Sequence, residues 1–354
     1  MRKASLLALT LVMGIGAALA GCGKKEAAPT TPGGSAAPAK TETVSMDIGM
    51  LKLTSSAPIF IAMEKGYFKE EGIDAKPKWF DAAQPIAVAT AGGSVQVGAT
   101  GISASLYNMV AGGQKLVIVA DKGREQKGYS STAFMVPTDS DVKSIEQLKG
   151  KKIGITQTGS TYHYMVGRLL EKHGLTLKDV ELVPLNSIKG LMESLKSKQV
   201  DSVMLNEPNL TTVAKEGYGR VLAQVGDEIE YQTSGVFFSP KLADNKDLSV
   251  HFLKAYAKAT RYYYDAVLTQ KDGKVVPGAN YDEVVKIIAK YTDQPEENVK
   301  QGLPYMDRDG KLLATDIKTQ VDWYAKEKLI DKAIDPAGIV NTSLLDEALK
   351  QLGK

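Results

Sequence analysis

Residues 45–80 read SMDIGMLKLTSSAPIFIAMEKGYFKEEGIDAKPKWF. The apolar pattern of this stretch predicts a β-strand at 45–51, a helix at 57–71 and a second strand at 75–80. Pro58 suits the first turn of the helix, because the N–H that proline lacks has no intrahelical partner there. A strand, a helix and a second strand in this order form the unit from which parallel sheets are built.

The same alternation continues along the chain and then restarts. The first series adds strands at 95–100 and 115–120 and helices at 82–91 and 102–111. The second series has strands at 152–156, 180–185, 201–205 and 220–224, with helices at 161–173, 188–198 and 208–216. The remainder is largely helical, with amphipathic patterns at 249–268, 281–291, 315–326 and 343–352.

Two α/β series followed by a helical segment predict two lobes with a cleft between them. Each lobe is expected to be a mostly parallel sheet with helices on both faces. Extended segments at 133–136 and 235–239 separate the series, and we expect them to be the crossovers of a hinge. The predicted divisions are lobe 1 at 44–136, lobe 2 at 137–235, and a return to lobe 1 with a helical C-terminal part at 236–354.

The N-terminus has the pattern of an exported lipoprotein. Two basic residues precede an apolar run at 6–20, and residues 19–22 read Leu-Ala-Gly-Cys, ending in the one cysteine of the 354-residue chain. This order describes a secretory signal peptide, here residues 1–21. A cysteine directly after small residues resembles a bacterial lipobox, in which the thiol is acylated. We therefore expect Cys22 to carry a lipid such as palmitate, with a buried or free cysteine as the alternative.

A flexible linker is predicted at residues 22–43, which are rich in Ala, Pro, Gly and Thr and hold little that a core could bury. We expect the roughly 310 residues that follow to work outside the cytoplasm, tethered to a membrane by the lipid. In a Gram-negative cell this is the periplasmic side of the envelope. A chain of this length favours two lobes over one core.

The charge balance excludes nucleic acid as a partner. The chain has 44 Lys and Arg against 41 Asp and Glu, and removal of the signal peptide leaves a balance of about +1. A surface that follows phosphates needs a strong basic excess. No segment after the leader is apolar for long enough to span a bilayer, so we expect the lipid to be the membrane attachment. Nothing in the pattern requires more than a monomer.

Loops at the carboxyl ends of the predicted strands share a composition. They are rich in small hydroxyl residues and glycine and lie at 54–58, 100–103, 157–163 and 206–208. Ligands of open α/β sheets collect at these ends, where backbone N–H groups stay uncovered and a helix N-terminus adds about half a positive charge. Several such ends around one cleft predict an anion site. For any single loop, ordinary helix capping is the alternative.

Three further groups have two interpretations each. Glu207 either pairs with a ligand ammonium or ring N–H, or is an acid favoured by a helix N-terminus. Trp79 and Phe80 end the second strand and either close over the ligand or cap the lobe core. Lys122 and Arg124 follow the fourth strand, where solvated surface side chains are the commoner outcome and charge for an anion is the alternative.

Nothing in the sequence indicates an enzyme, a cofactor or a metal. The histidines His163, His173 and His251 show no metal spacing. The mature chain has neither a Gly-x-Ser-x-Gly elbow nor a phosphate loop that ends in Gly-Lys-Ser/Thr. The acidic turn at 307–310 lacks the ligand spacing of a calcium loop.

Three stretches resemble one family. Residues 55–73, SSAPIFIAMEKGYFKEEGI, are similar to the opening motif of the nitrate, sulfonate and taurine substrate-binding proteins of ABC importers. That group includes thiamine-precursor binders of the NMT1/THI5-like type. Gly159-Ser160-Thr161 ahead of residues 169–175 is similar to its second-lobe turn, and residues 199–202 followed by Glu207-Pro208 resemble its acidic-Pro segment. The resemblance covers roughly residues 45–240.

The resemblance implies a two-lobed periplasmic binding protein fold of type II, which delivers a small solute to the permease and ATPase of an ABC importer. By position it implies first-lobe ligand contacts from Ser55, Ser56, Pro58, Gly101, Ser103 and Ala104. It implies second-lobe contacts from Ser160, Thr161 and Tyr162. Asn206 stands where many members have an aromatic residue, and Trp79 and Glu207 complete the candidate site.

The expected ligand is a small organic anion such as a sulfonate, a taurine-like zwitterion or a carboxylate, or nitrate. One alternative is a pyrimidine-type thiamine precursor or another aromatic solute, held by Trp79, Phe80 and Tyr162 with Glu207 as acceptor. Two further alternatives are a tethered sensor that works without a transporter and a lipid-anchored enzyme.

Overall fold

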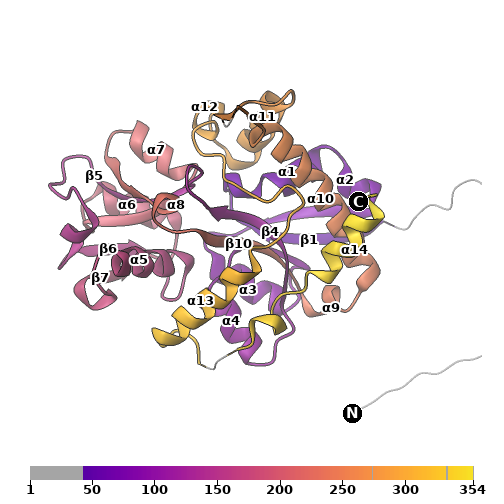
Figure 1. The fold of residues 1–354 in the computed structure, drawn as a ribbon, viewed down its shortest axis with the longest axis horizontal. Helices are drawn as coiled ribbons and strands as arrows, with labels where there is room; N and C mark the ends of the chain where they lie inside the picture. The colour runs from indigo at the N-terminus through magenta and orange to yellow at the C-terminus, as the bar shows by residue number, and fades with distance from the viewer. Residues whose placement is uncertain (1–42, 273, 332–333, 354) are drawn as a thin grey trace, which may run out of the picture. The chain divides into compact units, whose positions relative to one another are not determined.

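Two five-stranded sheets organise the part of the chain that the structure describes (Figure 1). The computed structural model describes residues 43–272, 274–331 and 334–353. The predicted signal peptide, the lipidation site Cys22 and nearly all of the predicted linker lie outside the described residues. In the first sheet the strands stand in the order β2-β1-β3-β10-β4, and in the second in the order β7-β6-β8-β5-β9.

The strands match the predicted pattern to within a few residues, except β4 and β10. The first sheet consists of β1 (Val44–Met50), β2 (Ile73–Trp79), β3 (Val97–Gly101), β4 (Val117–Glu125) and β10 (Tyr231–Phe238). The second consists of β5 (Thr132–Pro137), β6 (Lys152–Ile155), β7 (Glu181–Pro184), β8 (Ser202–Asn206) and β9 (Gly219–Gln224). A small separate hairpin pairs β11 (Gln270–Lys271) with β12 (Lys274–Val275).

One strand in each sheet runs against the other four. β1 pairs in parallel with β2 and β3, and β6 with β7 and β8. β10 lies antiparallel between β3 and β4, and β5 lies antiparallel between β8 and β9. Four of five strands in each sheet thus run the same way, as predicted. The sequence pattern predicts β4 as the neighbour of β3 in the sheet. Nothing in the pattern indicates that β10, from far along the chain, lies between them.

The crossovers between the sheets lie before the segments predicted for them. The chain passes from β4 to β5 through residues 126–131 and returns to β10 through residues 225–230. The predicted crossover at 133–136 lies inside β5, and most of the one at 235–239 lies inside β10. All six residues of β5 are buried and the strand is paired on both sides, so it is a rigid part of the sheet.

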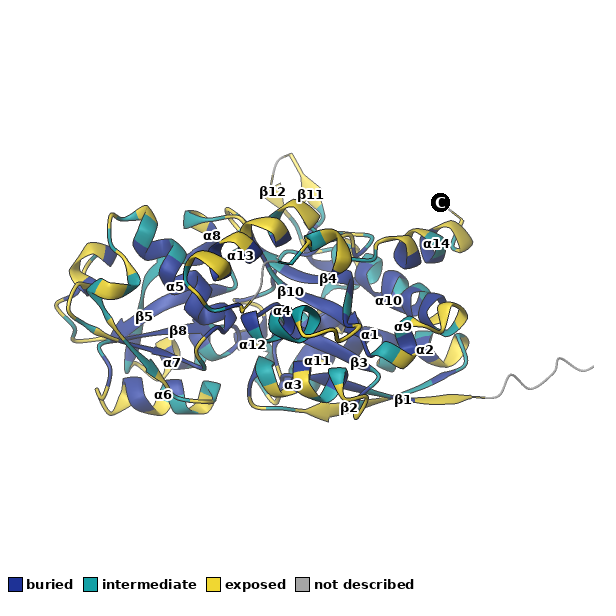
Figure 2. Ribbon diagram, turned by 90° about the horizontal axis from the view of Figure 1, so that it is seen from below, coloured by how far each residue is buried: buried dark blue, intermediate teal, exposed yellow. Residues whose placement is uncertain are grey.

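Helices cover the sheets. They begin with α1 (Ala57–Glu64), α2 (Tyr67–Glu70), α3 (Ala83–Ala91), α4 (Ala104–Ala111), α5 (Thr161–Lys172), α6 (Ile188–Lys196), α7 (Asn209–Lys215) and α8 (Val225–Glu228). The later ones are α9 (Pro240–Ala243), α10 (Lys246–Val267), α11 (Tyr281–Thr292), α12 (Glu296–Val299), α13 (Ala314–Lys326) and α14 (Ser343–Gln351). Figure 2 shows buried residues in the central strands and exposed ones on the outer faces of helices such as α14.

The single helix predicted at 57–71 is two helices. α1 ends at Glu64, and Gly66 has a left-handed φ of 77° before α2 begins. Glycine adopts this φ without the steric cost that other residues meet. Residues 57–62 of α1 are all buried, because the helix packs against both α10 and α11. No helix in the described ranges combines the length and apolar character needed to cross a bilayer.

The packing of β3 generates the first testable prediction. A Cβ on Gly98 would lie 2.2 Å from Cε2 of Phe237, a buried ring of β10, and 2.6 Å from Oγ1 of Thr90. We expect Gly98→Ala to destabilise the fold by about 1–3 kcal/mol, because the core must move to admit a methyl group. The measurement is the shift of the urea midpoint of the purified protein. In Gly92→Ala, the control, the methyl group meets one atom at 3.4 Å, and equal midpoint shifts for both variants would contradict the prediction.

Candidate functional site

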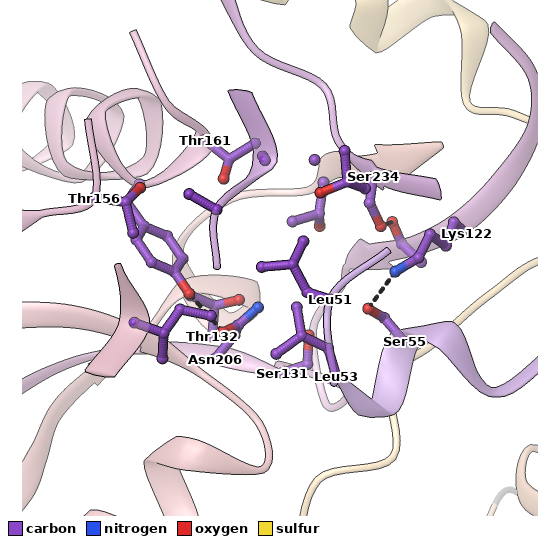
Figure 3. A pocket seen from close by; sticks show the side chains of 18 residues that line it. Leu51, Leu53, Ser55, Lys122, Ser131, Thr132, Thr156, Thr161, Asn206 and Ser234 are labelled. Carbon is purple, nitrogen blue, oxygen red and sulfur yellow. Dashed lines mark hydrogen bonds between the residues drawn. The ribbon is translucent and has the colours of Figure 1, made fainter. Parts of the chain in front are cut away.

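A cavity lies where strands of both sheets end (Figure 3). Its lining residues are Leu51, Leu53, Ser55, Ala82, Ala83, Thr100, Gly101, Lys122, Gly123, Ser131, Thr132, Thr156, Thr161, Tyr162, Ile188, Asn206, Thr233 and Ser234. The space open to the centre of a water molecule is about 50 Å³. A single water needs roughly 10–15 Å³ by this measure, so the cavity has room for a group of a few non-hydrogen atoms.

Lys122 is the one charged side chain among the described residues that line the cavity. It is 1% exposed, and its Nζ donates a hydrogen bond to Oγ of Ser55 at 2.8 Å (Figure 3). Burial lowers the pKa of Lys122 to about 7, and the negative charge of Asp121 opposes this shift. An ammonium with three donors is therefore held away from water beside an uncharged cavity.

The neighbouring carboxylate of Asp121 is engaged elsewhere. It accepts hydrogen bonds from the Gly123 N–H at 2.7 Å, Nε2 of Gln232 at 2.6 Å and the Asp307 N–H at 2.7 Å. Burial is the largest influence on its pKa, which is raised. No hydrogen bond or ion pair of the described residues joins this carboxylate to Nζ of Lys122. A ligand in the cavity is thus free to supply the counter-charge of the ammonium.

The interpretation of Lys122 as a solvated surface side chain is wrong. The predicted fourth strand ended at residue 120, but β4 continues to Glu125 because β10 pairs with it along that length. Lys122 therefore lies inside a paired strand, with buried residues on either side. Arg124 is likewise paired, with the carboxylates of Asp121 and Asp307, and does not line the cavity.

Neutral hydroxyl groups make up much of the remaining wall. Thr100 is 1% exposed and its Oγ1 has no hydrogen-bond partner among the described residues. Ser131 and Thr132 donate their hydroxyls to the buried carboxylate of Glu125 at 2.9 and 2.7 Å. The Tyr162 hydroxyl donates to Oδ1 of Asn206. The Thr100 hydroxyl thus keeps its proton for a ligand, whereas the hydroxyls of Ser131, Thr132 and Tyr162 donate theirs within the wall. The carboxylate of Glu125 stands behind this wall and is not among the lining residues.

The loops of the two sheets touch beside the cavity. The N–H at the start of α4, from Ala104, donates to the carbonyl of Gly159 in the loop after β6 at 2.9 Å. A Cβ on Gly101 would lie 2.6 Å from Cγ2 of Thr161. Gly159 has a left-handed φ of 76°, which glycine tolerates. The close approach of the two halves at this point thus depends on two glycines.

Five of the predicted ligand contacts line the cavity: Ser55, Gly101, Thr161, Tyr162 and Asn206. The remaining seven, Ala104 among them, do not. Ser56 donates to the carbonyl of Leu51, and Pro58 is buried in the first turn of α1. Ser103 and Ser160 occupy the N-cap positions of α4 and α5, and Ser160 accepts from the N–H of His163.

Glu207 is also turned away from the cavity. Its carboxylate accepts from the N–H and Oγ1 of Thr211 at 3.1 and 2.9 Å, which makes it an acid at a helix start rather than a cavity acceptor. Burial is the main cause of its raised pKa. For Glu207 and Ser160 the helix-capping alternative describes the geometry, whereas the buried Oγ of Ser103 has no hydrogen-bond partner among the described residues.

Trp79 lies in a neighbouring hollow that we call the outer groove. Its lining residues are Leu51, Lys52, Leu53, Trp79, Phe80, Asp81, Ser187, Ile188, Lys189, Met192, Asn209, Thr292 and Gln294. The groove is open, with a volume of about 420 Å³. Trp79 is 40% exposed, and the centroid of its ring lies 6.1 Å from that of Phe60. The ring therefore partly covers the lobe core and partly faces the groove.

The predicted ligand contacts include five of the eighteen residues that line the cavity. Thr100 and Thr156 stand at ends of parallel strands, where the rule for open sheets points to them. The pairs Ser131–Thr132 and Thr233–Ser234 belong to the two antiparallel strands, and no local signal tells which sheet those strands join. Among the described residues, no three His, Cys, Asp or Glu side chains group as metal ligands. The arrangement is suited to hold a small anion by one cation and several dipoles.

Comparison with known proteins identifies the family of the chain and structures with a similar fold. The family model described as NMT1/THI5 like matches residues 53–266. A protein of Bacillus subtilis (strain 168) named as an aliphatic sulfonates-binding protein is 24% identical over 306 residues, which cover 84% of this chain and 86% of that protein. The alkanesulfonate-binding protein SsuA from Xanthomonas axonopodis pv. citri, solved bound to MOPS, has a TM-score of 0.70 at 20% identity, covering 85% of this chain and 99% of that one.

Two further solved structures show how widely the fold is used. The periplasmic nitrate-binding protein NrtA from Synechocystis PCC 6803 has a TM-score of 0.69 at 15% identity, covering 88% of this chain and 90% of that one. The desulfurization enzyme DSZB has a TM-score of 0.64 at 16% identity, covering 87% and 99%. At these identities the likeness concerns the fold alone, and it confirms the predicted periplasmic binding protein architecture.

The burial of Lys122 generates a prediction about stability and pH. Its pKa is about 7 in the folded chain against an ordinary value of 10.5, so the folded chain binds fewer protons between these values. The free energy of unfolding should therefore rise with pH across this window, by at most about 1.4 kcal/mol per unit. Lys122→Met removes the buried charge and should be more stable than the parent at pH 6.5.

Urea denaturation at pH 6.5 and pH 9.5 checks this, and the advantage of Lys122→Met should shrink at the higher pH. Lys115→Met is the matched control, because that side chain is 73% exposed and precedes the same strand. An advantage that stays constant with pH, or a variant less stable than the parent at pH 6.5, would contradict the assignment.

Proposed function

The chain belongs to the NMT1/THI5-like family, and from this premise we propose that it is the extracytoplasmic solute-binding protein of an ABC importer. It captures a small organic anion in the cavity beside Lys122 and delivers it to the permease. One observation carries the choice of ligand: among the described residues, the buried ammonium of Lys122 has a single hydroxyl partner, and the other side chains that line the cavity are neutral.

An anionic ligand follows from the energetics of that ammonium. A buried charge is costly unless it is paired and hydrogen-bonded. A sulfonate or carboxylate group supplies both the opposite charge and several acceptors. A neutral pyrimidine supplies neither, and Tyr162 is the one aromatic side chain among the cavity's described lining residues. The anion is therefore favoured over the thiamine-precursor alternative.

Capture by closure of two lobes fits the positions of the crossovers. We infer that residues 126–131 and 229–230 form the hinge, with the two sheets as the centres of the lobes. Glu125 binds the first crossover through the hydroxyls of Ser130 and Ser131 at 2.7 and 2.9 Å. Ser131 also lines the cavity, so a ligand there lies against the hinge. A ligand that touches both halves shifts the population toward the closed form.

The proposal includes the importer's permease and ATPase as partners, a lipid anchor at Cys22, a monomeric chain and no catalytic activity. The fold by itself does not decide whether the chain is catalytic, because the desulfurization enzyme DSZB has a similar fold. Recovery of the bound solute in unchanged form after prolonged incubation with the purified protein tests this directly.

The main test identifies the ligand. Denaturation of freshly purified protein releases the bound species for mass spectrometry, and calorimetry follows with methanesulfonate, taurine, nitrate, acetate and a hydroxymethylpyrimidine. We expect anions to bind, more weakly at pH 8.5 than at pH 6, since Lys122 loses its proton above about pH 7. Lys122→Met should weaken the binding at least tenfold and Lys115→Met should not. Binding of neutral heterocycles alone would overturn the proposal.

The contact at Gly101 predicts a variant that folds but does not close. In Gly101→Ala the added Cβ would approach Cγ2 of Thr161 to 2.6 Å, so the two halves must separate. We expect the affinity for the ligand to fall about tenfold or more, because an overpacked contact costs about 1–3 kcal/mol. The thermal midpoint should stay unchanged, because the contact is between the two halves and not within either core. Thr161→Ser removes Cγ2 and keeps the hydroxyl, so the double variant should regain affinity. Failure of this rescue, with both variants folded, would refute the closing contact.

A further inference from the structure

The loop between β6 and α5 supplies one side of the contact between the two halves of the chain. The carbonyl of Gly159 in this loop accepts the N–H of Ala104, at the start of α4, at 2.9 Å. Thr161 begins α5, lines the cavity and approaches Gly101 of β3 (Figure 3). The shape of this loop therefore decides how the second half meets the first beside the cavity.

One side chain of α5 holds the loop in this shape. Nδ1 of His163 accepts the N–H of Gly159 at 3.0 Å, and the N–H of His163 donates to Oγ of Ser160 at 3.2 Å. Gly159 thus bonds through its N–H to its own half and through its carbonyl to the other half. A second anchor comes from α13, where the Tyr324 hydroxyl donates to the carbonyl of Ser160 at 3.2 Å.

The hydrogen bond from Gly159 fixes the protonation state of the imidazole. Nδ1 accepts a hydrogen bond only when it carries no proton, so the neutral ring carries its proton on Nε2. His163 is 5% exposed, and its Nε2 has no hydrogen-bond partner among the described residues. An apolar side chain would leave no such donor unpaired. The hydrogen bond to Gly159 is therefore what the imidazole adds at this position.

The surroundings of the ring keep it neutral. Burial lowers the pKa of His163 to about 4. From α13 the ring of Trp323 stands edge-on to the imidazole, with the two centroids 6.0 Å apart. Charged and titratable side chains of α5, α13, α8 and the turn at Ile145–Leu148 bond to other groups: Glu171 to Lys326, Asp316 to Gln232 and Gln320, Tyr324 to Ser160, and Glu146 and Glu228 to His173.

We propose that His163 is a positioning residue for closure of the two lobes, because its unprotonated Nδ1 holds Gly159 where the carbonyl meets Ala104 and Thr161 faces the cavity. The ring acts through the loop, since His163 is not among the residues that line the cavity. This inference rests on the proposed function and adds to it a release of the solute in acid. Protonation turns Nδ1 into a donor that faces another N–H, so the loop must shift and its contact with the first half weakens.

The sign of the pH effect follows from reciprocity. If protonation of the ring opposes closure, closure must oppose protonation by the same factor. The closed form therefore binds the ring proton less well than the open form, and the affinity for an anion should fall as the pH drops from 6 toward 4. Lys122 stays protonated over this range, because its pKa is about 7. A loss of affinity in acid thus has a source other than Lys122.

The experiment is calorimetry on the purified protein with methanesulfonate, whose charge does not change between pH 4 and pH 7. His163→Leu should raise the Kd at pH 7 about tenfold or more, since the Gly159 N–H loses its acceptor. His163→Asn puts an amide oxygen in place of Nδ1 and does not titrate, so its Kd should stay within about threefold of the parent. From pH 6 to pH 4.5 the parent Kd should rise about fivefold or more, and that of His163→Asn less than about twofold.

His173→Asn is the matched control. His173 lies at the other end of α5, where its ring bonds to Glu146 and Glu228. This variant should follow the parent at both pH values. The thermal midpoint of each variant at pH 7 shows that it is folded under the conditions of the titration.

Nitrogen NMR of the imidazole rings gives a readout that a merely structural role would not move. The chain has three histidines, so the spectrum of His163→Asn identifies the signals of His163. We expect a ring protonated on Nε2 at pH 7, and saturation with methanesulfonate should lower the pKa of His163 further.

Three results overturn the role of His163 and leave the proposed function intact, provided that Lys122→Met still weakens methanesulfonate. The first is a folded His163→Leu that binds as tightly as the parent. The second is a loss of affinity in acid that His163→Asn retains in full. The third is a pKa of His163 that is the same with and without the anion. A failure of every anion in the panel to bind refutes the proposed function itself.

Discussion

An ammonium group held away from water needs a counter-charge or a full set of acceptors, and among the described residues Lys122 has one hydroxyl acceptor and no ion pair. Ser55 supplies one hydroxyl acceptor, while the adjacent carboxylate of Asp121 is bound by the N–H groups of Gly123 and Asp307 and by Gln232. The ammonium therefore faces the cavity without an ion-pair partner, since the hydrogen bonds of the Asp121 carboxylate go to other groups. Because the cavity is small and its other lining side chains are neutral, this ammonium is the group that would select the charge of a ligand.

The fold places that charge where strands of the two sheets end. Each sheet has one strand that returns against the others, and the two crossovers run directly into these strands. The cavity is lined by Ser131 of the first crossover, by Thr132 at the start of β5, and by Thr233 and Ser234 of β10. A solute in the cavity would thus contact the first crossover as well as the facing loops, which is why the proposed closure of the lobes involves these residues.

The same architecture serves binding proteins and at least one enzyme, so side chains rather than topology decide what happens in the cavity. In this chain the described lining residues contain no acid, no histidine and no cysteine. They offer one cation, several hydroxyls and apolar side chains. These are groups of the kind that can hold and orient a small anion.

The sequence by itself determined the succession of strands and helices along the chain and the type of fold, and it predicted a ligand site at the strand ends. Periodicity reports which face of each element is buried, and Ser55, Gly101 and Thr161 followed from the rule that ligands collect beyond parallel strands. Only the tertiary structure decided which hydroxyls turn into the cavity and which cap their own helix, as Ser160 does. It also decided that Lys122 is buried, because β10 arrives from more than one hundred residues away to extend β4 around it. Local patterns carry no information about such a long-range partner, and a charge that looks solvated along the chain becomes the centre of the site once that strand is in place.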